Sequence, residues 1–129
     1  MNLRKVLVTG ANGQLGYELQ HTVAAGVELI ATDYQNLDIT NAAQIAAALE
    51  QYQPDLVINA AAYTAVDKAE SDQVNAQRLN GNAAGLIAQA VAQANSRKPT
   101  QLVHISTDFV FDGSSSLPYA TDAATAPLG

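Results

Sequence analysis

A glycine-rich turn directly after a short apolar run constrains the fold of this chain most. Residues 6–9 read Val-Leu-Val-Thr, the turn is Gly10-Ala-Asn-Gly-Gln-Leu-Gly16, and a helix-like stretch follows it. Glycine permits a tight turn and a close backbone approach. The N-terminus of a following helix offers free N–H groups and a partial positive charge, which suit a phosphate. The turn therefore stands where a dinucleotide-binding fold holds the pyrophosphate of its cofactor.

The acidic residue Asp33 strengthens this interpretation. The turn has the spacing GxxGxxG instead of GxGxxG, and by itself it is also compatible with an ordinary loop. Asp33 follows it by about twenty residues, where a carboxylate accepts hydrogen bonds from a ribose diol and favours NADH over a 2′-phosphorylated cofactor. The alternative is a hairpin turn at Asn12-Gly13. The residues after Gly13 lack the strict alternation of a strand, which argues against a hairpin.

Apolar runs and helix-like stretches alternate along the chain. This order predicts an α/β fold, a Rossmann-like doubly wound parallel sheet of about four strands. Residues 1–129 would form one NAD(P)-binding domain of this kind, and an incomplete one. The composition from Asp112 onward predicts a loop. The expected strands are residues 5–9, 27–32, 55–59 and 101–106, and the expected helices are residues 14–25, residues 42–52 with Thr40 as N-cap, and most of residues 65–95.

The composition excludes several classes of function. Six basic against twelve acidic residues give a net charge of −6, which argues against a nucleic-acid or anionic-membrane surface. The chain has no cysteine, so it has no disulfide or thiolate site, which fits a cytoplasmic protein. We find no signal peptide, no membrane span and no metal-ligand spacing.

The candidate site residues follow the expected strands, so we expect them at one edge of the sheet. The hydroxyls of Ser106 and Thr107 suit either the polarisation of a carbonyl group or the capping of a turn, and both interpretations stay open. Asp38, in an Asp-x-Thr sequence, is typical of helix capping. We interpret His104 as a core histidine and His21 as a solvated one.

Two longer motifs on this edge carry a specific resemblance. They are Asn59-Ala-Ala-Ala-Tyr-Thr-Ala-Val-Asp-Lys-Ala-Glu70 and Ser106-Thr-Asp-Phe-Val-Phe-Asp-Gly113. With them the chain resembles the N-terminal part of the dTDP-4-dehydrorhamnose reductases, which are extended short-chain dehydrogenases/reductases. That family reduces the 4-keto group of a dTDP-deoxysugar with NADH or NADPH, in the last step of dTDP-L-rhamnose synthesis.

The resemblance implies roles for particular residues. Thr107 matches the hydroxyl that polarises the sugar ketone, and Asp108 matches a substrate contact. No metal site is implied. With the residues of the glycine turn, the implied cofactor contacts are Gly10, Asn12, Gly13, Gln14, Leu15, Gly16, Asp33, Asp38, Ile39, Ala62, Tyr63 and Thr64.

The chain departs from the family in one respect. The family's Tyr-x-x-x-Lys pair supplies the proton, and no tyrosine of this chain has a lysine four residues later. We therefore expect the 129-residue chain to be inactive by itself. Two alternatives are another extended sugar-nucleotide reductase or epimerase, and a non-catalytic regulatory relative such as the beta subunit of methionine adenosyltransferase.

The fourth expected strand leads to a prediction about assembly. In this fold we expect it beside the first strand, with an unpaired outer edge. An apolar edge of this kind favours pairing with another chain. We therefore expect self-association, unless the residues from Asp112 onward fold back over that edge.

Overall fold

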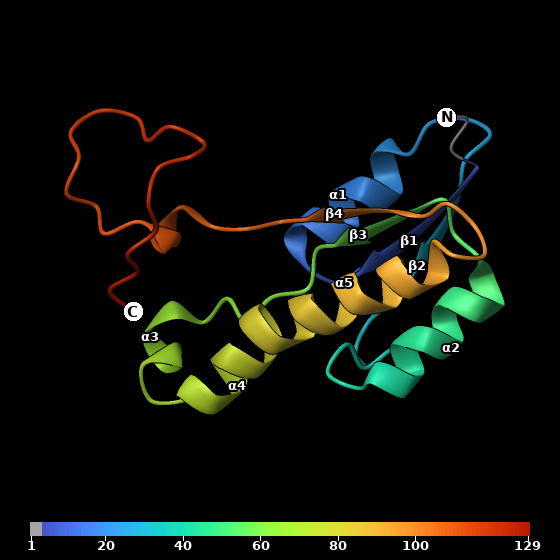
Figure 1. Cartoon of the computed structure of the whole chain (residues 1–129), viewed down its shortest axis with the longest axis horizontal. Helices are drawn as coiled ribbons and strands as arrows, with labels where there is room; N and C mark the ends of the chain where they lie inside the picture. The colour runs from blue at the N-terminus through green and yellow to red at the C-terminus, as the bar shows by residue number, and fades with distance from the viewer. Residues whose placement is uncertain (1–3) are drawn as a thin grey trace.

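A four-stranded parallel sheet forms the centre of the molecule (Figure 1). The structure, a computed structural model, describes residues 4–129. The strands are rich in apolar residues, as strands of a parallel sheet covered by helices are. They are β1 (Lys5–Thr9), β2 (Glu28–Ala31), β3 (Leu56–Asn59) and β4 (Gln101–His104), in the order β2-β1-β3-β4.

The position of β4 differs from our expectation. β4 pairs with β3, in the register Leu56↔Gln101, and β1 lies between β2 and β3. The prediction that the fourth strand lies beside the first is therefore wrong. The physical reason is that β3 already occupies that side of β1. The crossover from β3 then returns to the neighbouring free edge, as sequential strands commonly do.

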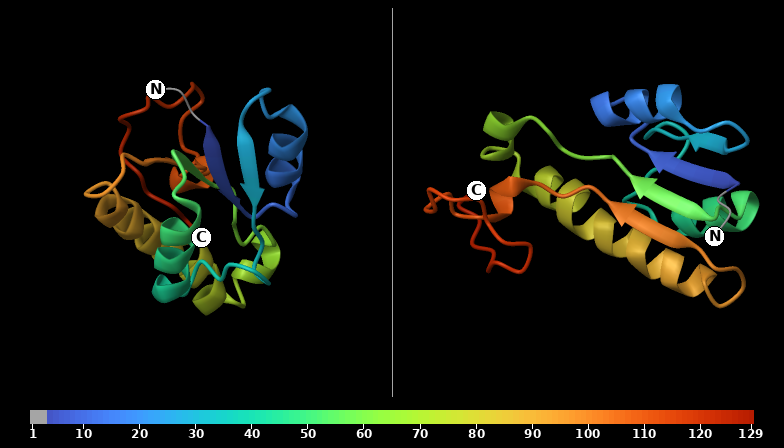
Figure 2. Two further views of the ribbon diagram at one scale, coloured as in Figure 1. Left: turned by 90° about the vertical axis from the view of Figure 1, so that its right-hand side faces the viewer. Right: turned by 90° about the horizontal axis from the view of Figure 1, so that it is seen from above.

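Helices cover both faces of the sheet, which confirms the doubly wound α/β fold (Figure 2). Helix α1 (Gln14–Thr22) lies on one face, and α2 (Ala42–Tyr52) and α5 (Ala83–Ala94) lie on the other. The main core lies between the sheet and this second pair. Its buried side chains include Leu7, Ile45, Leu49, Val57, Ile87 and Val91.

The long helical stretch expected over residues 65–95 is interrupted. It consists of α3 (Val66–Ala69), α4 (Gln73–Gln77), a π-helical turn η1 (Arg78–Asn82) and α5. α1 ends at Thr22 because Val23 is extended, and Gly26, with φ +84°, turns the chain toward β2.

The start of α2 corrects one residue assignment. The N-cap is Asn41, whose side-chain oxygen accepts from the backbone N–H of Gln44 at 3.1 Å. The prediction that Thr40 is the N-cap is therefore wrong. The Thr40 hydroxyl donates to Asp38 Oδ1 at 2.6 Å and accepts from Arg78 Nη2 at 2.8 Å, so it contacts these side chains and not the first turn of the helix. The Asp-x-Thr sequence thus forms its own turn immediately before the helix.

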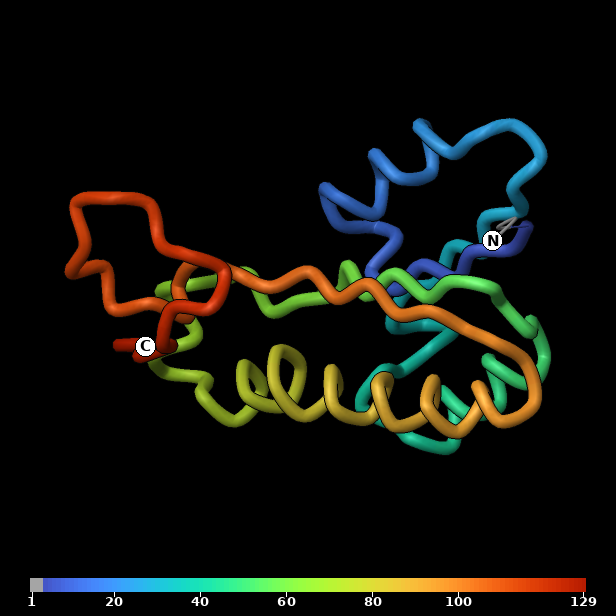
Figure 3. The backbone as a smooth tube through the Cα atoms, turned by 45° about the horizontal axis from the view of Figure 1, so that its top comes forward, coloured from blue at the N-terminus to red at the C-terminus, as the bar shows by residue number. Residues whose placement is uncertain are grey.

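The last part of the chain is a loop, as predicted. After the 3-10 turn η2 (Asp108–Val110), residues 111–129 form neither helix nor strand. They form a loop that extends away from the sheet and returns to η2, where the backbone N–H of Ala126 donates to the carbonyl of Val110 at 2.9 Å (Figure 3). Within residues 4–129, no helix is long and apolar enough to cross a membrane.

Candidate functional site

The loops that follow the strands meet at one edge of the sheet, because all four strands are parallel. The strand order reverses between β1 and β3, and ligands of such sheets bind in the crevice beyond that point. The glycine turn follows β1 and residues 60–64 follow β3, so these two loops flank the crevice. Residues 105–108 leave β4 on the same edge.

The three glycines of the turn have different surroundings. Gly10 has φ +68°, and a Cβ there would lie 2.6 Å from the backbone N of Ala61. A Cβ on Gly16 would lie 2.2 Å from the carbonyl oxygen of Gly10, so this glycine lets α1 pack against the turn. Gly13 meets only that same carbonyl oxygen, at 3.3 Å. Gly10 and Gly16 therefore serve the fold, whereas Gly13 leaves its backbone accessible from outside.

The first turn of α1 has unused donors. Gly13 is the N-cap, and no side chain caps the helix. The N–H of Gly13 donates to Gly10 and that of Tyr17 donates to Gly13, but the N–H groups of Gln14, Leu15 and Gly16 have no acceptor within residues 4–129. Three unused donors at a helix N-terminus make a place for an anion. The hairpin alternative at Asn12-Gly13 is wrong, because a helix follows the turn.

Asp33 is connected directly to the glycine turn. Its Oδ2 accepts from Asn12 Nδ2 at 2.6 Å, and its Oδ1 accepts from the backbone N–H of Gln35 at 2.9 Å. The backbone N–H of Ala11 also donates to the carbonyl of Thr32 at 2.9 Å. These bonds fix the carboxylate beside the turn. Each oxygen keeps acceptor capacity for a further donor, such as a ribose hydroxyl.

Asp38 and Ile39 follow Asp33 in the segment that connects β2 to α2. Ile39 is buried, so only its backbone is available to a ligand. Hydrogen bonds from the hydroxyl and the backbone N–H of Thr40 lower the pKa of Asp38, and the charge of Arg78 adds to the effect. Arg78 Nη2 donates to Thr40 Oγ1 at 2.8 Å. A hollow of about 210 Å³ opens here, lined by Tyr34, Asp38, Thr40, Asn75, Arg78 and Leu79.

The loop after β3 is held by a contact that the sequence analysis missed. The Asn80 side chain accepts from the backbone N–H of Tyr63 at 2.7 Å and donates to its carbonyl at 3.0 Å. Asn80 belongs to the π-helical turn η1. The signal in the sequence was Asn80-Gly81-Asn82, a run of weak helix formers within a helical stretch. Such π-helical turns often occur at functional sites.

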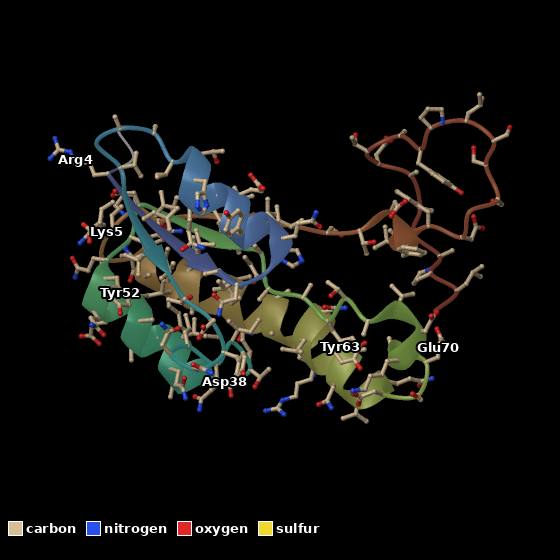
Figure 4. All side chains as sticks on the ribbon, turned by 180° about the vertical axis from the view of Figure 1, so that it is seen from behind. Arg4, Lys5, Asp38, Tyr52, Tyr63 and Glu70 are labelled. Atoms are coloured by element: carbon tan, nitrogen blue, oxygen red, sulfur yellow. The ribbon has the colours of Figure 1, made fainter. Side chains whose placement is uncertain are left out.

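The side chain of Tyr63 points toward the segment around α4 (Figure 4). Its hydroxyl donates to Asp72 Oδ2 at 3.0 Å. Partial burial raises the pKa of Tyr63, and the hydrogen bond to Asp72 raises it further. The phenol is therefore held as a neutral donor to Asp72.

His104 is not a core residue, so that interpretation was wrong. β4 is the outermost strand, and the His104 side chain is exposed. Its Nδ1 is 3.0 Å from Nδ2 of Asn59, which is only 1% exposed. His21 is exposed on α1, as expected, and its Nδ1 lies 2.7 Å from the carbonyl oxygen of Tyr17.

Thr107 and Asp108 lie where β4 gives way to η2. Thr107 Oγ1 accepts from the backbone N–H of Phe109 at 3.2 Å and so caps η2. The hydroxyl proton lies toward Asp108 Oδ1, 3.4 Å away. Both side chains are exposed, and the long bond to Asp108 would have to be exchanged for the hydroxyl to donate to a carbonyl group. Among residues 4–129, no three His, Asp or Glu side chains are grouped as metal ligands would be.

Comparison with known proteins gives the family. The model of the RmlD substrate binding domain matches residues 4–129. This chain belongs to the RmlD substrate binding domain family. It is 43% identical over 124 residues to a dTDP-4-dehydrorhamnose reductase of Burkholderia thailandensis, an alignment that covers 96% of this chain and 40% of the relative.

Two further relatives show to which other proteins the chain is similar. A probable dTDP-4,6-dihydroxy-2-methyloxan-3-one 4-ketoreductase of Streptomyces antibioticus is 43% identical over 122 residues, covering 94% of this chain and 40% of the relative. The crystal structure of the Bacillus anthracis dTDP-4-dehydrorhamnose reductase in complex with NADP is 36% identical. It superposes with a TM-score of 0.91 over 97% of this chain and 43% of that one. The chain thus spans well under half the length of these relatives.

Proposed function

We propose that residues 1–129 form the NAD(P)-binding, Rossmann-like part of a dTDP-4-dehydrorhamnose reductase. The whole enzyme reduces the 4-keto group of dTDP-4-dehydro-L-rhamnose in dTDP-L-rhamnose biosynthesis. One observation carries the proposal: three unused N–H groups of α1 lie at the crevice between β1 and β3, next to the bridge between Asn12 and Asp33. Unused donors beside a ribose acceptor fit a dinucleotide.

The proposal assigns a part of the cofactor to each loop. The pyrophosphate lies on Gly13, Gln14 and Leu15, and the ribose diol lies on Asp33. The Bacillus anthracis relative binds NADP, so membership of the family is compatible with a 2′-phosphate. Asp33 favours NADH because a carboxylate accepts from a 2′-hydroxyl and repels a 2′-phosphate. The remaining proposed contacts are Gly10, Asn12, Gly16, Asp38, Ile39, Ala62, Tyr63 and Thr64.

The proposed chemistry places Thr107 and Asp108, at the start of η2, against the substrate. When bound, the reduced nicotinamide supplies a hydride to C4 of the sugar. Thr107 donates its hydroxyl to the ketone oxygen, and Asp108 contacts the substrate. In the family pattern, the proton for that oxygen comes from the Tyr-x-x-x-Lys pair. No tyrosine here has a lysine four residues later, so we expect the 129-residue chain not to turn over. A missing general acid typically costs about two to four orders of magnitude.

The identity of the sugar has an alternative with a specific observation behind it. The Streptomyces 4-ketoreductase is as similar to this chain, at 43% identity, as the Burkholderia reductase is. A reductase for another dTDP-4-keto sugar is therefore the second candidate. No observation favours the non-catalytic regulatory relative. We also place the chain in the cytoplasm, on its lack of cysteine.

We further propose that the 129-residue chain self-associates through β4. Val103 is 44% exposed and Ile105 is 46% exposed. No backbone hydrogen bond joins residues 111–129 to β4, so the tail does not cover this edge. An uncovered apolar edge strand favours pairing with another chain. Sedimentation of wild type and Val103→Lys would test this. The proposal is supported if the wild type forms dimers and Val103→Lys is a monomer. It is contradicted if the wild type is a monomer at high concentration.

The cofactor proposal is tested by titrating the chain with NADH and NADPH and following the nicotinamide fluorescence. We expect binding of both, with NADH favoured. Gly13→Ala places a methyl group where the pyrophosphate should lie, so it should weaken both cofactors about tenfold or more with little change in the unfolding midpoint. Failure of the wild type to bind either dinucleotide would contradict the proposal, as would rapid turnover by the 129-residue chain.

A further inference from the structure

Thr9, Asn59 and His104 are the last residues of β1, β3 and β4, and they lie side by side in the sheet. Their side chains are linked across the three strands. Thr9 Oγ1 donates to Asn59 Oδ1 at 2.5 Å, and Asn59 Nδ2 is 3.0 Å from His104 Nδ1. The next residue after each of them begins a loop of the candidate site. This row of side chains therefore lies directly beneath the glycine turn, residues 60–64 and residues 105–108.

The hydrogen-bond partners determine where the protons lie. The backbone N–H of Ala61 points at Asn59 Oδ1, 3.4 Å away. An N–H group only donates, so the atom it faces is the amide oxygen, and Nδ2 faces His104. Because Nδ2 also only donates, Nδ1 of His104 accepts and carries no proton. The neutral imidazole is then protonated on Nε2.

We propose that His104 is a positioning residue of the cofactor site. As a neutral imidazole with its proton on Nε2, it holds the Asn59 amide and, through Ala61, the loop after β3. Protonation of Nδ1 releases this arrangement. The inference rests on the proposed function in one respect, namely that residues 62–64 contact a dinucleotide.

The loss of this arrangement on protonation follows from the number of hydrogen-bond donors and acceptors around Asn59. A proton on Nδ1 faces the N–H groups of the Asn59 amide, and the hydrogen bond between them is lost. If the amide turns over to restore it, Oδ1 leaves Thr9 and Ala61. The Thr9 hydroxyl can reorient and accept, but the N–H of Ala61 cannot. Protonation therefore removes the hydrogen bond between Asn59 and His104 in the first arrangement, and the hydrogen bond from Ala61 in the second.

No charged group on the adjoining elements competes for the ring. β3 reads Leu-Val-Ile-Asn and α5 contains only apolar, Gly and Gln residues, so neither carries a titratable side chain. His104 is the only titratable residue of β4. The nearest charged residue along the chain is Asp108, which lies toward Thr107. Asn59 is the one hydrogen-bond partner of the imidazole within residues 4–129.

The first experiment is independent of any ligand. Nitrogen-15 NMR of the histidine rings of the whole chain at about pH 8 should show His104 as the tautomer protonated on Nε2. On acidification, the protection of the Ala61 amide against hydrogen exchange, taken relative to an unfolded amide at the same pH, should fall in parallel with protonation of the His104 ring followed by NMR. A tautomer protonated on Nδ1, or an Ala61 protection that does not change in parallel with protonation of the His104 ring, would overturn the proposal.

The second experiment uses variants and NADH as the probe. His104→Leu removes the acceptor and should weaken NADH binding about tenfold at pH 8. His104→Gln retains an acceptor oxygen and does not titrate, so it should bind NADH within about threefold of wild type and lose the pH dependence that the wild type shows. The matched control is His21→Leu, at the only other histidine, which should change neither property.

The two proposals fail in different ways. If the wild type binds neither dinucleotide, the proposed function fails, while the tautomer and the Ala61 exchange still decide the role of His104. If the wild type binds NADH and His104→Leu binds it equally well, the role of His104 is refuted. Should His104→Leu fail to fold, a wild-type-like pH dependence in His104→Gln would also refute it, because Gln does not titrate.

Discussion

At the amino edge of the sheet the polar groups bind one another, whereas at the carboxyl edge several are left without a partner. Asp55 dominates the amino edge. Its Oδ2 accepts from the backbone N–H groups of Arg4 and Lys5, each at 2.9 Å, and its Oδ1 pairs with Lys98 Nζ at 2.9 Å. Lys98 also donates to the carbonyl of Gln53. Asp55 thus joins the start of β1, the start of β3 and the approach to β4.

The carboxyl edge has the opposite character. Three N–H groups of α1 have no acceptor there, and the oxygens of Asp33 keep acceptor capacity. Buried polar groups are ordinarily paired because an unpaired one is costly. Unpaired groups at an exposed edge cost little, since water satisfies them until a ligand replaces it. The comparison teaches that one edge stabilises the fold and the other is available for binding.

The largest predicted effect concerns the glycine that fixes α1 to the carboxyl edge. Gly16→Ala puts a Cβ 2.2 Å from the carbonyl oxygen of Gly10 and 2.6 Å from Ala11 Cα, so backbone must move. We expect a loss of about 3 kcal/mol in the free energy of unfolding, measured by urea denaturation, together with loss of NADH binding.

The control for this substitution is another helical glycine. A Cβ on Gly85 meets nothing within 4 Å. Gly85→Ala should therefore stabilise the chain by up to about 1 kcal/mol, because alanine favours a helix over glycine. Equal effects of the two substitutions would show that helix propensity, and not the close approach to Gly10, decides the requirement at Gly16.

The next effect tests the amino edge. Asp55→Asn replaces a carboxylate that accepts three hydrogen bonds, so we expect a loss of about 1–2 kcal/mol in the free energy of unfolding, discounted for the partial exposure of Lys98. NADH binding should not change. Asp67→Asn, on α3, is the control and should be close to neutral. A loss of cofactor affinity in Asp55→Asn with unchanged stability would break the division between the edges.

The same carboxylate gives a prediction about pH. The hydrogen bond from Lys98, followed by those from Arg4 and Lys5, lowers the pKa of Asp55 from 3.8 to about 2. A group whose pKa is lower in the folded state stabilises the fold above its unfolded value and loses that contribution as the pH falls through the folded value. The stability difference between wild type and Asp55→Asn should therefore be constant from neutral pH to about pH 5 and shrink between about pH 4 and about pH 2.

A structural feature could be predicted from the sequence where neighbouring residues determine it, and could not where it depends on residues far apart in the chain. The apolar strands, α2 and the glycine turn were predictable, because periodicity and turn chemistry belong to neighbouring residues. The role of Asp55 was not, since its partners lie about 50 residues away on other elements. The partner of His104 and the place of β4 also depend on which strand a crossover reaches. The Asn80 contact was missed because it joins residues 17 positions apart.

A smaller effect concerns cofactor choice at the carboxyl edge. Asp33→Ala removes the proposed acceptor of the 2′-hydroxyl and the charge that repels a 2′-phosphate. We expect NADH to weaken more than NADPH, with a change of about tenfold in the ratio of their dissociation constants, measured by fluorescence titration. Asp55→Asn, which removes a carboxylate at the other edge, should leave that ratio unchanged. An unchanged ratio in Asp33→Ala would mean that Asp33 does not face the ribose.

The smallest effect separates stability from binding at one residue. Asn80→Ala removes the two hydrogen bonds to the backbone of Tyr63. Both are exposed, so water replaces them, and the free energy of unfolding should fall by less than about 1 kcal/mol. The loop of residues 60–64 becomes less ordered, and a ligand must then supply the cost of ordering it, which should weaken NADH binding about threefold to tenfold.

The matched control lies in the same π-helical turn. Asn82 accepts one long hydrogen bond, from Gln77 Nε2 at 3.4 Å, and none of its bonds reaches the loop after β3. Asn82→Ala should therefore change neither stability nor NADH affinity appreciably. If Asn80→Ala costs as much stability as Asp55→Asn and leaves NADH binding intact, then residues 60–64 belong with the structural contacts of the amino edge. The distinction between the two edges would then fail at this loop and hold only for the glycine turn and Asp33.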